Sequence, residues 1–113
     1  MNKYRDKSDF EINKAVAIQL DNDGKITSWA AVNGIMVGIA GEDYAKKFDP
    51  CNDPADTFPL IIDMKLSIHP DFYNNCESWI VRTVHIPPVK DKSLTRAICI
   101  AYLMMKDAEN EKV

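Results

Sequence analysis

The chain has 113 residues and a net charge of −3, with 46% hydrophobic and 27% charged residues. This is the composition of an ordinary globular domain, and it lacks the low hydrophobicity of a disordered chain. An acidic balance argues against duplex binding as the main activity, because such binding gains much of its affinity by neutralising phosphates. The length predicts a single domain over residues 1–113, and we expect residues 1–7 and 109–113 to fray.

The three cysteines, Cys51, Cys76 and Cys99, lack the C-x-x-C spacing of a metal or redox motif. An odd number of dispersed cysteines argues against a disulfide framework and favours a reducing compartment. The longest apolar run, residues 97–105, is about half as long as a membrane span requires. We therefore expect a cytoplasmic protein that makes no contact with a membrane.

The first predicted element is a helix that begins after Ser8. Ser8 and Glu11 fit a capping box, in which the hydroxyl accepts from the Glu11 amide and the Glu11 side chain reaches back. Apolar residues follow at helical spacing and predict a single stripe that faces a core. The residues of this stripe are Ile12, Ala15, Val16 and Leu20. A polar turn over residues 21–24 then ends the helix.

A β-hairpin is expected next, with strands over residues 25–32 and 35–40. Asn33-Gly34 supplies the two positive-φ positions that a type I′ turn requires. Residues 43–52 are polar and contain a proline, which predicts a loop rather than a strand.

A short helix is predicted from Pro54 to about Met64. Asp53 fits its N-cap, and Pro54 fits the first helical position, where the missing amide costs nothing. Pro59 lies beyond the first turn and is expected to bend or delay this helix. The side chains expected to face the core are Phe58, Ile61 and Ile62.

The rest of the chain predicts two further strands, over residues 66–69 and 78–86, and a last helix. Pro70 ends the first strand, and Pro87-Pro88 ends the second. The last helix begins after an Asp91 or Ser93 cap and is apolar nearly all round, so it should be the most buried helix, with Met105 in its core stripe. The order α-β-β-α-β-β-α predicts an α+β fold with one four-stranded, mainly antiparallel sheet packed with helices.

Three segments together resemble the NinX-like proteins of tailed bacteriophages and enterobacterial prophages. These segments are residues 8–17 (SDFEINKAVA), 48–62 (FDPCNDPADTFPLII) and 93–108 (SLTRAICIAYLMMKDA). The features that carry the likeness are the opening helix, the Cys-Asn-x-x-Ala-Asp segment before an aromatic-Pro pair, and the Met-rich Arg-Ala helix. The resemblance implies a phage or prophage origin and expression in the cytoplasm of the bacterial host. It implies no activity, and hence no catalytic residue.

Residues suited to catalysis or metal binding are dispersed along the chain. Cys51, His69 and His85 are the residue types of a thiol catalyst, but any chain with a few cysteines and histidines contains such a set. No C-x-x-C or H-x3-H pair favours zinc, and no glycine-rich phosphate loop follows a strand. We therefore assign no catalytic residue, cofactor or metal.

The polar segment before the second predicted helix is the most informative loop. Its candidate contact residues are Asp49, Cys51, Asn52 and Asp56, since loops with chemically distinctive side chains often carry function. A structural role explains the same residues. Cys51 would be a small buried hydrophobe, Asn52 would satisfy local backbone, and Asp53 and Asp56 would favour the helix N-terminus.

Three functions remain open from the sequence. The first, which we favour, is a non-enzymatic accessory protein that binds a bacterial or phage-encoded protein. The second is a small-ligand or metal-dependent enzyme built around Cys51, Asn52, Asp53 and Asp56. The third is a nucleic-acid-binding protein with a local basic patch, assembled from Arg5, Lys7, Arg82 and Lys90. The net charge disfavours the third, and homo-oligomerisation is compatible with all three.

Overall fold

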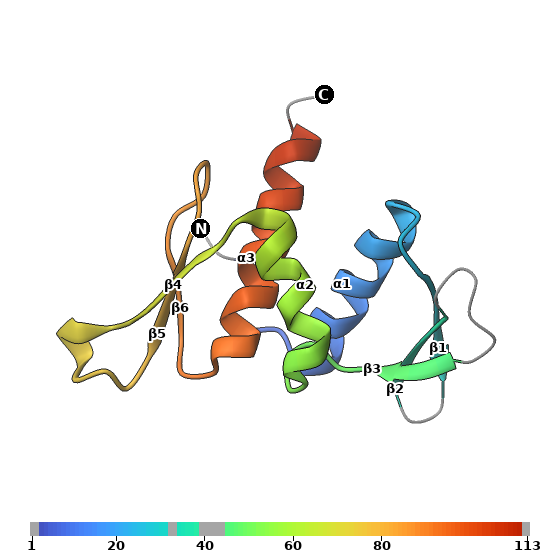
Figure 1. Ribbon diagram of the computed structural model, residues 1–113, viewed down its shortest axis with the longest axis horizontal. Coiled ribbons are helices and arrows are strands. Elements are labelled where there is room, and N and C mark those ends of the chain that lie inside the picture. The colour runs from blue at the N-terminus through green and yellow to red at the C-terminus, as the bar shows by residue number, and fades with distance from the viewer. Residues whose placement is uncertain (1–2, 32–33, 39–44, 112–113) are drawn as a thin grey trace.

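The described residues, 3–31, 34–38 and 45–111 of a computed structural model, form three helices and two three-stranded antiparallel sheets. The sheets lie at opposite ends of the molecule with the helices between them (Figure 1). The helices are α1 (Asp9–Asn22), α2 (Pro54–Met64) and α3 (Leu94–Glu111), and a 3-10 turn, η1, spans Phe72–Asn74. The first sheet consists of β1 (Thr27–Ala31), β2 (Gly34–Gly38) and β3 (Ala45–Phe48). The second consists of β4 (Ser67–Pro70), β5 (Trp79–Arg82) and β6 (Val89–Asp91).

The α+β class is confirmed, whereas the single four-stranded sheet is wrong. Each predicted hairpin gains a third strand, and the two sheets remain separate. The first missed strand, β3, lies in the segment predicted as a polar loop and pairs with β2, with Phe48 opposite Ile35. The second, β6, follows Pro87-Pro88 directly. The strand predicted over residues 78–86 is shorter than expected, since β5 already ends at Arg82. Pro87-Pro88 lie outside both ladders, so they remove no hydrogen bond from β6.

The predicted first hairpin forms, with β1 and β2 antiparallel and Ala31 opposite Gly34. Gly34, predicted as a turn residue, instead begins β2, so the pairing is shifted by one residue from the expected one. Its φ of 132° is a conformation that only glycine adopts without strain. The other residue of the expected turn, Asn33, and the end of the expected second strand, residues 39–40, lie outside the described residues.

The predicted helix starts are confirmed by their capping bonds. The Ser8 hydroxyl accepts from the Glu11 amide at 3.1 Å, and the Asp53 carboxylate accepts from the Ala55 amide at 3.0 Å. Ser93 precedes α3, and its hydroxyl accepts from the Arg96 amide at 3.3 Å. Each cap satisfies an amide that has no partner within its own helix.

The orientation of α2 differs from the sequence prediction. Phe58 and Ile62 are 60% and 59% exposed, while Thr57 and Leu60 are buried. The Thr57 hydroxyl makes burial possible by donating to the carbonyl of Asp53, at 3.2 Å. The helix runs through Pro59 without a break. Pro59 leaves the carbonyl four residues earlier without its helical donor, and that residue is exposed, so water can bond to it.

The last helix, α3, is the centre of the fold. It packs on α1 and α2 and on β5 and β6 (Figure 1), and every residue from Ala97 to Leu103 is at most 3% exposed. Met105, predicted in the core stripe of this helix, is buried. No helix in the described part of the chain is long and apolar enough to cross a membrane.

The two core tyrosines provide a test of this packing. The Tyr102 hydroxyl is buried and has no hydrogen-bond partner among the described residues, whereas the Tyr4 hydroxyl donates to Asp107 at 2.5 Å. Tyr102→Phe removes an unsatisfied polar group and should raise the free energy of unfolding by about 1 kcal/mol. Tyr4→Phe removes a charge-assisted bond and should lower it by about 2 kcal/mol. Urea denaturation of both variants measures this; similar losses for both would contradict the described environment of Tyr102.

Candidate functional site

The connection from β3 to α2 brings three of the four predicted contact residues together, with Asp53 at its end. It is a tight turn in which the Asp49 carbonyl accepts from the amides of Asn52, at 3.0 Å, and Asp53, at 2.7 Å. The Asp49 amide donates to the Asp56 carboxylate at 3.0 Å, which brings in the fourth. Local backbone geometry thus gathers the residues that the sequence singled out.

A residue of α1 that sequence reasoning missed holds this turn in place. Asn13 is 6% exposed, and its side-chain nitrogen donates to Asp49 Oδ1 at 2.6 Å. Its side-chain oxygen accepts from the Cys51 amide at 2.9 Å. Asn13 sits next to Ile12 in the apolar stripe of the helix. A polar residue beside such a stripe was the only signal in the sequence that could have revealed it.

Cys51 lies in the core rather than at the surface. Cys51 and Cys99 are 1% and 0% exposed, and the Cys51 carbonyl accepts from the Thr95 hydroxyl at the start of α3. The neighbouring Cys51 side chain and burial both raise the pKa of the Cys99 thiol well above its usual range. A reactive thiol needs a low pKa and access to solvent, so this environment favours inert, structural cysteines.

Arg96 of α3 joins the N-terminal segment to the helices. Its guanidinium donates to Asp9 at 2.6 Å and lies 3.3 Å from Asp91. It also donates to the backbone carbonyls of Arg5, at 3.1 Å, and Lys7, at 2.6 Å. The Arg96 side chain is 15% exposed, and its planar fork of donors holds two carboxylates and two carbonyls at once.

The carboxylates around the turn are engaged with neighbouring side chains. Asp56 is almost fully buried and pairs with Lys46 at 2.5 Å. Asn52 donates to Asp49 at 3.1 Å and to Asp9 at 3.4 Å. We call this connected set the polar joint; it consists of Asp9, Asn13, Asp49, Asn52, Asp56 and Arg96.

A shallow hollow of about 200 Å³ lies beside the polar joint. Its polar lining residues are Asp9, Asn13, Lys47, Asp49 and Asn52. Most of these groups already bond to one another, so the hollow offers little for positioning a substrate. Among the described residues, no group of three or more His, Cys, Asp or Glu side chains is placed to hold a metal ion.

The histidines of the suggested thiol catalyst lie elsewhere. His69 is in β4 and His85 in the connection between β5 and β6, where it adopts a φ of 76°. The described residues contain no hydrogen bond between Cys51 and either histidine. His69 and the connection that holds His85 belong to the second sheet region, which packs on α3 through β5 and β6, whereas Cys51 lies in the turn between β3 and α2 (Figure 1).

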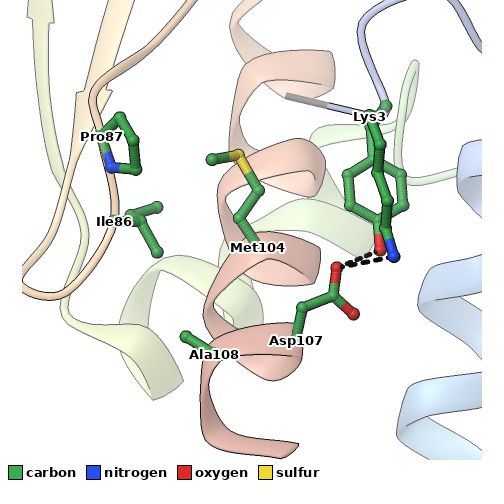
Figure 2. A pocket seen from close by; sticks show the side chains of 7 residues that line it. Lys3, Ile86, Pro87, Met104, Asp107 and Ala108 are labelled. Atoms are coloured by element: carbon green, nitrogen blue, oxygen red, sulfur yellow. Dashed lines mark hydrogen bonds and ion pairs between the residues drawn. The ribbon is translucent and has the colours of Figure 1, made fainter. Parts of the chain in front are cut away.

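A second hollow, of about 210 Å³, lies between α3, the N-terminal segment and the connection that holds Ile86 and Pro87 (Figure 2). Asp107 points toward Lys3 and Tyr4, at 3.4 Å from the Lys3 ammonium nitrogen. Burial, and then the hydrogen bond to Asp107, raise the pKa of Tyr4 above its usual range, so its phenol stays protonated. These contacts fasten the first residues to the last helix.

A third hollow, of about 250 Å³, is largely apolar and lies between α2 and the first sheet. Its apolar lining residues include Leu20, Ile26, Val37, Phe48 and Leu60. Two ion pairs border it, Lys25 with Asp63 and Lys46 with Asp56, both at 2.5 Å. Beside it, α2 presents four exposed apolar residues, which we call the α2 apolar face: Ala55, Phe58, Pro59 and Ile62.

Fold and site together define a small α+β domain in which the predicted contact loop is part of a structural joint. The family model described as "Bacteriophage P22, NinX" matches residues 3–106. The chain therefore belongs to this bacteriophage family, as the resemblance in its three segments had suggested, and family membership indicates a phage accessory protein. Neither a curated protein nor a solved structure matches the chain.

Replacement of Asn13 tests the polar joint. Asn13→Leu keeps the volume but leaves the Cys51 amide and part of the Asp49 carboxylate without a partner. We expect the free energy of unfolding to fall by about 3 kcal/mol. Asn22→Leu, at an exposed position in the same helix, should change it by no more than about 0.5 kcal/mol. Equal effects in a denaturation series would show that Asn13 does not hold the loop.

Thiol reactivity tests the placement of the cysteines. Cys76 is exposed and the other two are buried, so we expect one thiol per folded chain to react rapidly with Ellman's reagent. All three should react in guanidinium chloride. The variant Cys76→Ser should show no rapid reaction. A second fast thiol in the folded protein would mean that Cys51 or Cys99 is open to solvent.

Proposed function

We propose that this phage accessory protein acts by binding another protein through the α2 apolar face and the adjoining hollow. The observation that carries the proposal is the composition of that face. The solvent-exposed side of a helix is polar in most soluble domains, whereas here it carries Phe58 and Ile62. Contiguous exposed apolar surface commonly marks a site of protein interaction.

The energetics of this surface suit a partner. Phe58 and Ile62 are 60% and 59% exposed, so covering them would contribute about 1–2 kcal/mol each. The hollow of about 250 Å³ beside them has room for an apolar side chain of the partner. The ion pairs at its border supply the polar rim that surrounds the apolar centre of many interfaces.

The enzyme alternative around Cys51, Asn52, Asp53 and Asp56 has less support. Its cysteine is buried, Asp53 caps α2, and Asp56 pairs with Lys46. These contacts supply structural reasons for the residues that motivated it. In the proposed function, the partner is a host or phage protein in the cytoplasm of an infected bacterium.

A variant that places charge on the face tests this function. Phe58→Asp should reduce recovery of a stoichiometric partner from phage-infected bacteria at least tenfold, because a carboxylate would be buried at the interface. Ile18→Asp is the matched control, since Ile18 is 48% exposed on α1. Quantitative mass spectrometry of the captured proteins provides the measurement, and circular dichroism confirms that both variants fold. A partner retained equally by both variants would place the binding surface elsewhere.

A further inference from the structure

The second sheet borders a hollow whose lining includes no residue of the polar joint or of the α2 apolar face. Its volume is about 440 Å³, and three cationic side chains line it, those of Arg5, Lys90 and Lys92. Residues far apart in the sequence meet here because Arg96 binds the backbone carbonyls of Arg5 and Lys7. The backbone of Arg5 is therefore fixed beside the first turn of α3, which follows β6 in the chain.

Two of the three acids that line this hollow are occupied. Asp71 is 4% exposed and accepts from the backbone amide two residues ahead at 3.2 Å. Asp91 lies 3.3 Å from the guanidinium of the polar joint. Arg5 and Lys92 take part in no ion pair within the described part of the chain, and one exposed acid, Asp6, stands near them. The groups available to a ligand are thus mainly cationic.

Two exposed aromatic side chains belong to the short turn that directly follows Asp71, a residue that lines the same hollow. Phe72 is 73% and Tyr73 99% exposed, and both belong to η1. A hydrogen bond joins the two ends of the loop that carries them, from the Asp71 amide to the Ser78 carbonyl at 2.9 Å. Asp71 and Ser78 both line the hollow. Trp79, which is 37% exposed, is the next residue after Ser78, and it lies opposite Asp91 in the pairing of β5 with β6.

We propose that this surface binds single-stranded nucleic acid, with bases stacked on Tyr73 and Phe72 and phosphates near Arg5 and Lys92. Proteins that bind single strands without sequence preference combine cations that contact the phosphate backbone with exposed aromatic rings that stack on the bases. The proposal adds a ligand site to the protein-binding function and does not depend on it, because the two surfaces share no residue.

The net charge of the protein favours a single strand over a duplex. Duplex affinity comes largely from phosphate neutralisation, to which an acidic protein is poorly suited. Stacking of bases on aromatic rings adds to the affinity without requiring a positive net charge on the protein. It needs the flat faces of bases, which only an unpaired strand exposes. The few available cations should therefore give a shallow dependence of affinity on salt.

The basic patch expected from the sequence is only partly assembled. Arg5 and Lys90 line one hollow, as that expectation required. Lys7 instead pairs with Glu11 at 3.7 Å, and Arg82 lies at the opposite end of β5 from Trp79. Lys92 was not anticipated as part of the patch, since nothing in a linear sequence shows that it lies near Arg5.

Fluorescence anisotropy with a labelled 12-nucleotide oligo-dT, in 20 mM and 200 mM salt, tests this site in the full-length protein. We expect binding at low salt that Tyr73→Ala weakens about fivefold or more. Lys92→Ala should weaken it and make the salt dependence shallower by about 0.7 in the log–log slope. Matched controls are Phe58→Ala, an exposed aromatic on α2, and Lys14→Ala, an exposed cation on α1; neither should change the affinity.

Three results would overturn the proposal. One is the absence of oligo-dT binding at low salt with 100 µM folded protein. Another is binding that Tyr73→Ala leaves unchanged, which would indicate attraction to charge alone. The third is equal affinity for a 12-base-pair duplex, because paired bases cannot stack on Tyr73. Tyr73 is almost wholly exposed, so its variant should fold, and thermal denaturation verifies this.

Discussion

The arrangement of this protein depends on the need to cover α3 on every side. From Ala97 to Leu103 the helix exposes at most 3% of any residue, so no face of it meets solvent. One sheet can cover only one side of a helix, and the remaining sides need other elements. Here β5 and β6 cover one side, while α1 and α2 cover another and carry the first sheet beyond them (Figure 1). Two small sheets satisfy this constraint where one larger sheet would not.

Elements packed around a central helix must also be connected without leaving buried polar groups unpaired. The polar joint does this where α1, the turn after β3 and the start of α3 converge. Asn13 accepts from the Cys51 amide, and Arg96 donates to two backbone carbonyls that lie outside any helix or strand. Buried polar groups are costly when unpaired and specify one arrangement when fully paired. The loop with the most distinctive chemistry in the sequence is therefore mainly a structural connection.

The features that the sequence predicted correctly depend on residues close together in the chain, and those that it missed depend on residues far apart. Capping at Ser8 and Asp53 depends on atoms within three residues, and the α+β class depends on local periodicity; both were predicted correctly. The strand β3 has little apolar patterning of its own and forms because β2 offers an edge. The side of α2 that faces inward is set by Thr57 and Leu60 packing on distant elements, and hydropathy alone selected Phe58 instead. Asn13 was missed for the same reason, since its partners lie 36 and 38 positions away.

Some side chains of this molecule are buried or bonded within the fold, and others are exposed to solvent. Cys51, Asp49 and Asp56 are occupied by the fold, which leaves little for chemistry on a substrate. The large apolar side chains that the fold leaves exposed include Phe58 and Ile62 on α2 and Phe72 and Tyr73 on η1. A domain of marginal stability gains nothing from large apolar groups in water, because covering them is favourable only when a ligand or partner is present. Both binding surfaces proposed above are built from side chains of this kind.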